Sequence, residues 1–92
     1  LRPEAEQDIE EAAGWYEKQL VGLGNEFLDE VLVTLERVAE LPSLYPAIYR
    51  NTQRALIHRF PFGIYYRIAG EQVVVVAVMH ARRHTTRWKK RT

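Results

Sequence analysis

Residues 62–80 read FGIYYRIAGEQVVVVAVMH, and the fold prediction starts from this segment. Two runs of β-branched and aromatic residues flank Ala69-Gly70-Glu71, which is typical of a β-hairpin with a tight turn. A two-residue turn at Gly70-Glu71 pairs Ile68 with Val73, and counting outward assigns every other residue to a face. The face predicted to cover the core holds Phe62, Ile64, Tyr66, Ile68, Val73, Val75, Ala77 and Met79. The opposite face holds Tyr65, Arg67 and His80 among Val74, Val76 and Val78, the mixture expected of a binding surface.

Before the hairpin, the period of the apolar residues changes. Residues 54–60 are rich in β-branched and aromatic side chains and predict a third strand, whereas residues 43–51 look irregular. Further upstream, apolar residues recur at three- and four-residue steps and predict two amphipathic helices. Pro3 suits the first turn of the first helix, Asn25 is the predicted N-cap of the second, and Pro42 ends it.

The loop between the two predicted helices is short, so the helices form an antiparallel hairpin. One apolar stripe on this hairpin needs a partner, and the inner face of the sheet supplies it. The sequence therefore predicts a single α+β domain in which an N-terminal helical hairpin packs on a small sheet.

The two halves of the chain carry opposite charges, although the net charge is +1. Residues 1–40 contain eleven acids and three bases, whereas residues 41–92 contain one acid, Glu71, and ten bases. Residues 81–92 alone carry six positive charges, and we expect a basic tail or a short helical turn there. The asymmetry indicates an anionic or charge-complementary partner for the basic half. The alternative is that the acidic helices neutralise the basic sheet within one fold.

Several chemistries find little support in the residues. The chain has no cysteine, which fits a reducing compartment such as the cytoplasm, and its apolar runs fall short of the roughly 18 residues of a membrane span. The hydroxyl side chains occur in no nucleophile motif. His58, His80 and His84 have no cysteine or acid nearby in sequence to complete a zinc shell, so neither a metal nor another cofactor is predicted.

Arginines carry the strongest chemical signal. Five of them are expected to converge at one end of the sheet: Arg59, Arg67, Arg82, Arg83 and Arg87. Tyr65 and Trp88 would be available there to stack on bases, and guanidinium groups match phosphate. Contact with an acidic protein surface explains the same arginines equally well. Around the helical turn, Leu20, Val21 and Leu23 are candidates for contact with a partner segment.

The order of several segments resembles the RelE/ParE toxin superfamily over essentially the whole chain. These segments are Pro3-Glu-Ala-Glu-Gln-Asp8, Trp15-Tyr16, Gly22-Leu-Gly-Asn-Glu-Phe27, Pro42-Ser-Leu-Tyr-Pro46 and Arg59-Phe-Pro-Phe-Gly-Ile-Tyr-Tyr66. The ending Val76-Ala-Val-Met-His80, with Arg82-Arg83 and Trp88, is similar to the ParE branch in particular. The resemblance implies one toxin domain over residues 1–92, with the helical hairpin on a twisted, mainly antiparallel sheet. Because the chain starts at Leu1 and not at a methionine, we expect missing sequence before it, including the first strand of the family.

The resemblance also implies a partner. Toxins of type II toxin–antitoxin modules form heteromeric complexes with an antitoxin, here a ParD-like one, whose disordered segment wraps and masks the toxin. The expected antitoxin contacts are Leu20, Leu23, Arg59, Tyr65 and Arg67.

The superfamily contains two activities. RelE-like members cut mRNA on the ribosome with basic residues and usually a terminal tyrosine, whereas ParE-like members inhibit DNA gyrase. Trp88 stands at the position of that tyrosine, and indole is neither a general acid nor a general base. We therefore expect a gyrase inhibitor and not a ribonuclease, with Arg82, Arg83, Arg87 and Trp88 in the acting surface. The alternatives are an mRNA endonuclease that uses Tyr65, His80 and Arg82, and a non-toxic member that retains only antitoxin binding.

Overall fold

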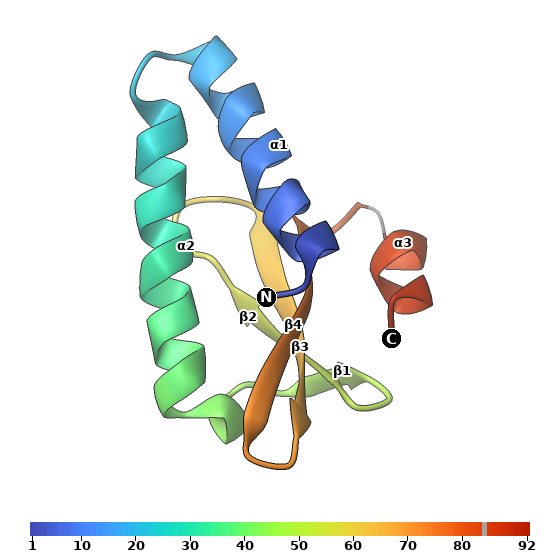
Figure 1. Ribbon diagram of the computed structural model, residues 1–92. Coiled ribbons are helices and arrows are strands. Elements are labelled where there is room, and N and C mark those ends of the chain that lie inside the picture. The colour runs from blue at the N-terminus through green and yellow to red at the C-terminus, as the bar shows by residue number, and fades with distance from the viewer. Residues whose placement is uncertain (84) are drawn as a thin grey trace.

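A helical hairpin lies across one face of a four-stranded antiparallel sheet, and a short third helix lies on the other side (Figure 1). The structure is a computed structural model and describes residues 1–83 and 85–92. Its elements are α1 (Pro3–Gln19), α2 (Leu23–Glu40), a 3-10 turn (Pro42–Leu44), β1 (Ala47–Tyr49), β2 (Thr52–Leu56), β3 (Phe62–Ala69), β4 (Gln72–His80) and α3 (Thr85–Lys90). The strands lie side by side in chain order, so each connection is a short antiparallel one. The predicted α+β fold is confirmed.

The helical hairpin forms as its apolar period predicts, but α2 begins earlier than expected. Its N-cap is Gly22, whose φ of +90° is the left-handed conformation that favours glycine. The Glu17 carboxylate accepts hydrogen bonds of 3.0 Å from the backbone N–H groups of Gly22 and Gly24. Glu17, on the last turn of α1, thus does the capping that was predicted for Asn25, and it fixes the angle between the two helices.

A bulge in the β3–β4 hairpin changes the predicted register. Tyr66 pairs with Val75 as predicted, but Tyr65 pairs with Ala77, so that Val76 is an extra residue in β4. Beyond this bulge every residue of β4 lies one position away from the expected partner. The bulge therefore reverses the faces predicted for the second half of β4.

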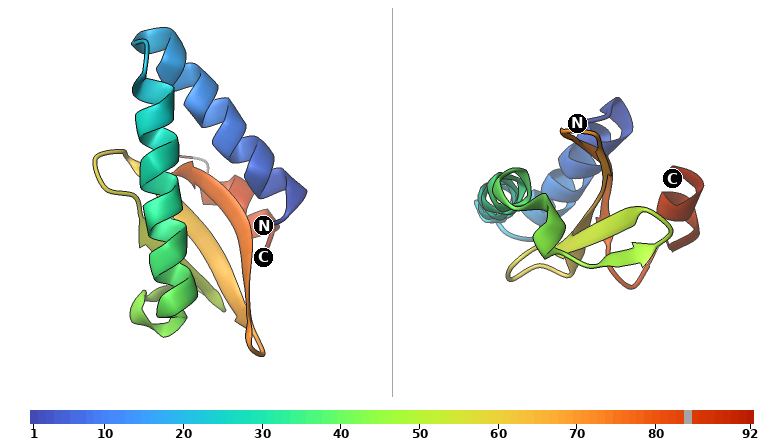
Figure 2. Two further views of the ribbon diagram at one scale, coloured as in Figure 1. Left: turned by 60° about the vertical axis from the view of Figure 1, so that its left-hand side comes forward. Right: turned by 90° about the horizontal axis from the view of Figure 1, so that it is seen from below.

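The sheet consequently has two cores, one on each face. Figure 2 shows α1 and α2 on one side of the sheet and α3 on the other. The helix face, which packs on α1 and α2, contributes Ile57, Ile64, Tyr66, Val75 and Val78. The outer face, which packs on α3, contributes Tyr65, Val76, Ala77 and Met79. The prediction that Ala77 and Met79 lie on the helix face is wrong, as is the prediction that Val78 lies opposite them.

The segment before β3 also differs from expectation. The irregular stretch contains a short strand, β1, because its residues pair with β2 across the turn at Arg50 and Asn51. The strand predicted over residues 54–60 is shorter and earlier, since β2 ends at Leu56 and Arg59 adopts a positive φ of 72° in the following turn. Within the described part of the chain, no helix is long and apolar enough to cross a membrane.

Candidate functional surface around the C-terminal helix

The basic C-terminal segment is a docked helix and not a free tail. Trp88 of α3 is only 3% exposed and stacks on Tyr65 of β3, with ring centroids 4.5 Å apart and planes 20° apart. Tyr49 of β1 meets the edge of the same indole at 5.8 Å. Offset stacking of this kind adds to the free energy of burying the rings. The three aromatic rings therefore hold α3 against the outer face of the sheet.

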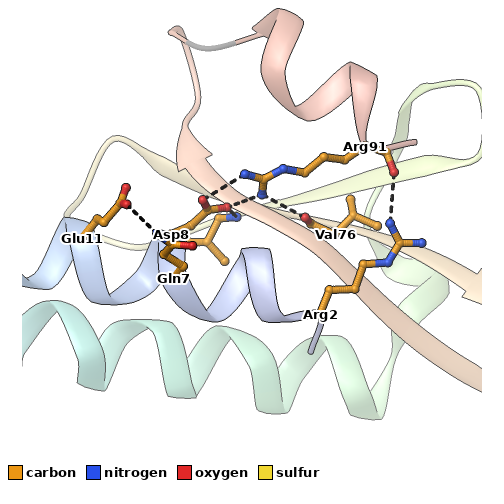
Figure 3. Close-up of polar contacts among 7 residues, drawn as sticks. Arg2, Gln7, Asp8, Glu11, Val76 and Arg91 are labelled. Carbon is orange, nitrogen blue, oxygen red and sulfur yellow. Dashed lines mark hydrogen bonds and ion pairs between the residues drawn. The ribbon is translucent and has the colours of Figure 1, made fainter.

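A buried ion pair fastens the end of α3 to α1 and β4 (Figure 3). The Arg91 guanidinium donates two hydrogen bonds to the Asp8 carboxylate, at 2.6 and 3.2 Å, and a third to the Val76 carbonyl at 3.1 Å. Asp8 also accepts a 3.0 Å bond from the Val78 N–H. Arg2 donates to the Arg91 carbonyl at 3.1 Å, so both ends of the chain meet here. We call this Asp8–Arg91 arrangement the clasp.

The clasp was not predicted, although the sequence holds a signal for it. Asp8 lies three residues after Ala5 and four before Ala12, and all three side chains are buried on α1. An acid on the apolar stripe of a helix needs a partner, because an unpaired buried carboxylate costs several kcal/mol. The sequence indicates that such a partner exists but not that it is Arg91.

The clasp and the bulge also meet at the edge of β4 that faces away from β3. The Val76 carbonyl and the Val78 N–H point away from β3, and they bond to the side chains of Arg91 and Asp8. The Arg2 N–H reaches the neighbouring Val75 carbonyl at 3.3 Å. Edge strands need such protection from uncontrolled pairing.

The residues proposed for ribonuclease chemistry do not come together. Tyr65 lies on the outer face and is fully buried, whereas His80 lies near Phe62 on the helix face, with ring centroids 5.9 Å apart. Burial raises the pKa of Tyr65, an effect that the positive charge of Arg54 opposes. The expectation that His80 shares a face with Tyr65 is wrong, because the bulge turns it over.

The two aromatic residues expected to stack on bases are not exposed. The faces of Tyr65 and Trp88 lie against each other, and the indole Nε1 is buried without a hydrogen bond among the described residues. The Tyr65 hydroxyl is buried as well, with Arg54 nearby but no hydrogen bond of good geometry among those residues. In this conformation Trp88 is buried between α3 and the sheet and offers no ring face to a partner.

The five arginines expected to converge are in fact distributed. Arg82, Arg83 and Arg87 are exposed and follow β4 closely. Arg59 lies across the sheet, where its guanidinium pairs with Glu26 on α2 at 2.8 Å, and this contact raises the pKa of Arg59. Arg67 lies near the other end of β3, opposite Val74. Of the five, the three that follow β4 remain close together in the chain, and we call Arg82, Arg83 and Arg87 the cationic end.

The loop after β4 is ordered by His80. Its Nδ1 accepts a 3.1 Å hydrogen bond from the Arg82 N–H, and its carbonyl accepts a bond from the Arg83 N–H. A hollow of about 410 Å³ beside this loop is lined by Trp15, Tyr16, Pro61, Phe62, His80 and Arg83. A second hollow of about 260 Å³ adjoins it through Trp15, Phe62 and His80.

The residues expected to contact an antitoxin have mixed exposure. Leu20 is 61% exposed at the hairpin turn, whereas Leu23 is half-buried and packs against the core. Tyr65 is buried, so a direct contact with it requires α3 to move. A hollow of about 450 Å³ lies between α2 and β2, and Val33 and Leu56 are exposed at its wall.

The described residues contain no group of three or more histidine, cysteine or acidic side chains that would hold a metal. His58 is exposed and lies 3.8 Å from Glu30. His84, named with His58 and His80 as a metal candidate, lies outside the described residues.

A helical hairpin on an antiparallel sheet, with a cationic helix clasped to the outer face, defines a small α+β protein. The sequence model of the ParE toxin of the type II toxin–antitoxin system parDE matches residues 1–85, and the chain belongs to this family. A solved chain from the structure described as "Chromosomal ParDE TA system from P. aeruginosa" has a similar fold. Its TM-score is 0.65 at 16% identity, over 86% of this chain and 89% of that one. No curated protein sequence matches the chain significantly.

Proposed function

We propose that this toxin inhibits DNA gyrase and that a cognate antitoxin neutralises it. The observation that carries the proposal is the cationic end after β4, where Arg82, Arg83 and Arg87 are exposed on a chain that belongs to the ParE toxin family. His80 holds the backbone of this loop, and the clasp holds the helix that follows it. Preorganised charges of this kind lower the cost of binding a partner.

Gyrase inhibition is tested by a supercoiling assay with the purified toxin. We expect inhibition by the native chain and at least tenfold weaker inhibition by the double variant Arg82→Ala/Arg83→Ala, because it removes two exposed charges from the acting surface. The matched control is Lys18→Ala/Arg37→Ala, which removes the same charge from the helical hairpin. Normal supercoiling at micromolar toxin, or equal loss in both variants, contradicts the proposal.

The mRNA endonuclease has no observation in its favour beyond the family resemblance, since Tyr65 and His80 lie on opposite faces. Induced expression separates the two activities. A gyrase inhibitor causes a DNA-damage response while transcripts stay intact, whereas an endonuclease produces cuts in transcripts that primer extension maps to codons. Growth without either response points to a non-toxic family member.

For the antitoxin we propose the apolar surface between α2 and β2. Val33 and Leu56 are 42% and 58% exposed there, at the wall of the hollow of about 450 Å³. Exposed apolar side chains beside a hollow are the usual anchors of a protein partner. Co-expression with the antitoxin tests this placement: Val33→Asp/Leu56→Asp should abolish co-purification, whereas Leu41→Asp/Leu44→Asp, a matched change at exposed leucines after α2, should not.

A further inference from the structure

The sheet separates the charges of the molecule into two layers. The acids lie mainly on α1 and α2, which cover the helix face (Figure 2). Arg54 pairs with Tyr65 and Arg67 pairs with Val74, and both partners belong to the outer-face core. Five cations therefore belong to the outer side of the sheet: Arg50, Arg54, Arg67, Lys89 and Lys90. We call these five the outer-face platform.

Two members of the platform share one aromatic ring. The Lys89 ammonium lies 5.0 Å from the Tyr49 centroid, and the Arg50 guanidinium carbon lies 5.1 Å from it. The two charges are therefore within about 10 Å of each other, and contact with the ring restricts both side chains. Since Trp88 and Arg91 point inward from α3, the helical period places Lys90 on its outward side.

The platform is not neutralised inside the molecule. Arg59 forms ion pairs with α2, and Arg91 forms one in the clasp. No ion pair is found among the described residues for the five platform cations. The Arg67 Nε is buried without a hydrogen-bond partner in the same part of the chain. The sole acid of residues 41–92, Glu71, lies in the β3–β4 turn. This layer is thus available to a polyanion.

The platform has the features of a phosphate-binding surface and not of a peptide-binding one. None of the hollows described above is lined by its five cations, so it offers no pocket for an apolar anchor. Lysine is depleted at protein interfaces but supplies many contacts to phosphates. Single strands bind by stacking on exposed aromatic rings, whereas Tyr65 and Trp88 cover each other here.

We infer that the outer-face platform binds the phosphate backbone of duplex DNA without regard to sequence. The inference rests on the proposed function in one respect, because gyrase acts on duplex DNA and a toxin held there is delivered to its target. Backbone contacts of this kind position a protein but read no bases. The acidic helical hairpin faces the other way, and so the net charge of +1 understates the attraction.

The test is a fluorescence anisotropy titration of a labelled 20-base-pair duplex, with no gyrase present. If all five cations meet phosphates, log K falls with log salt at a slope of about −4.5, which is a loss of roughly 500-fold between 50 and 200 mM salt. The variant Lys89→Ala/Lys90→Ala should bind at least tenfold more weakly at 50 mM salt, and its slope should be smaller by about 1.8. Lys18→Glu changes the net charge by the same amount on α1 and should bind as the native chain does.

The single variant Lys90→Ala covers the case in which the double variant does not fold, since Lys90 is exposed and stacks on no ring of the described residues. It should keep the native melting temperature and reduce the slope by about 0.9. A slope near zero, equal binding by the double variant and the native chain, or equal weakening by Lys18→Glu overturns the inference. So does tighter binding of a single strand of the same length, or equally tight binding of a poly-glutamate peptide. Because gyrase is absent, failure here leaves gyrase inhibition untouched, and the supercoiling assay can fail while this one succeeds.

Discussion

Replacing Arg91 with methionine should release α3 from the sheet. The change keeps a long apolar side chain but leaves the Asp8 carboxylate with the Val78 N–H as its one remaining partner in the clasp. The Asp8 and Arg91 side chains are 7% and 19% exposed, so the pair is shielded from water. Removing one partner of a buried ion pair costs about 3–5 kcal/mol.

α3 should detach in this variant, because the cost of the unpaired carboxylate exceeds the free energy that burial of Trp88 contributes to docking α3. Burial of one large apolar side chain, here Trp88, contributes about 1.5–3 kcal/mol. Detaching α3 lets water reach Asp8 and therefore costs less than keeping an unpaired carboxylate buried. We expect a loss of about 2–3 kcal/mol in the free energy of unfolding, which for a domain of this size lowers the melting temperature by roughly 10–20 °C.

The assay uses the fluorescence of Trp88 in a Trp15→Phe background, since Trp15 is 58% exposed and would mask the signal. In the Arg91→Met variant, Trp88 emission should move to longer wavelength and become accessible to acrylamide. Lys90→Met is the matched control, because it removes the same charge from an exposed position of α3. Unchanged emission and quenching, together with a melting temperature within about 4 °C of the native value, would refute the reasoning.

Three further predictions concern stability and are checked by thermal or denaturant unfolding. Gly24→Ala should destabilise the helical hairpin, because the added Cβ would lie 2.7 Å from the Ala13 carbonyl oxygen. The Cβ added by Gly14→Ala meets no described atom within 4 Å beyond its chain neighbours and its own helix backbone, so this change should stabilise α1 by about 0.5–1 kcal/mol. Tyr66→Phe should cost about 1 kcal/mol, since its hydroxyl donates a 2.6 Å hydrogen bond to a backbone carbonyl. Tyr65→Phe should cost less, because its buried hydroxyl has Arg54 nearby but no hydrogen bond of good geometry among the described residues. Burial raises the pKa of both tyrosines above the ordinary value of 10.0, so the folded state retains their protons to higher pH than the unfolded chain does. Stability should therefore hold below pH 10 and decline as the pH rises through the folded pKa values, and tyrosinate absorbance should appear only at the higher pH. Titration of all tyrosines near pH 10 would contradict this prediction. Equal changes in stability within either variant pair would contradict the other two.

The proposed acting surface was only partly predictable. The cationic residues Arg82, Arg83 and Arg87 could be identified from the charge pattern, and they are exposed after β4 as expected. That α3 is docked could not be identified, because a segment with six positive charges and no acid looks like a solvated tail. Its stability comes from Trp88 and Arg91, whose partners lie far away in the chain.

The parts of this protein that depend on local period and turn chemistry could be predicted from the amino-acid sequence alone. Two helices, their short connection at Gly22, the β3–β4 turn at Gly70 and the separation of charge along the chain all follow from residues close together in sequence. These features depend on backbone preference and side-chain spacing, which are properties of residues close together in the sequence.

Which residues share a face of the sheet depends instead on long-range packing. One extra residue at Val76 moved His80 to the helix face, although the turn itself was placed correctly. Asp8 and Arg91 are 83 positions apart, and nothing in the period of either segment connects them. Bulges and buried ion pairs depend on how distant elements pack together. They contribute to stability only after the sheet, α1 and α3 are assembled, so the local sequence does not predict them.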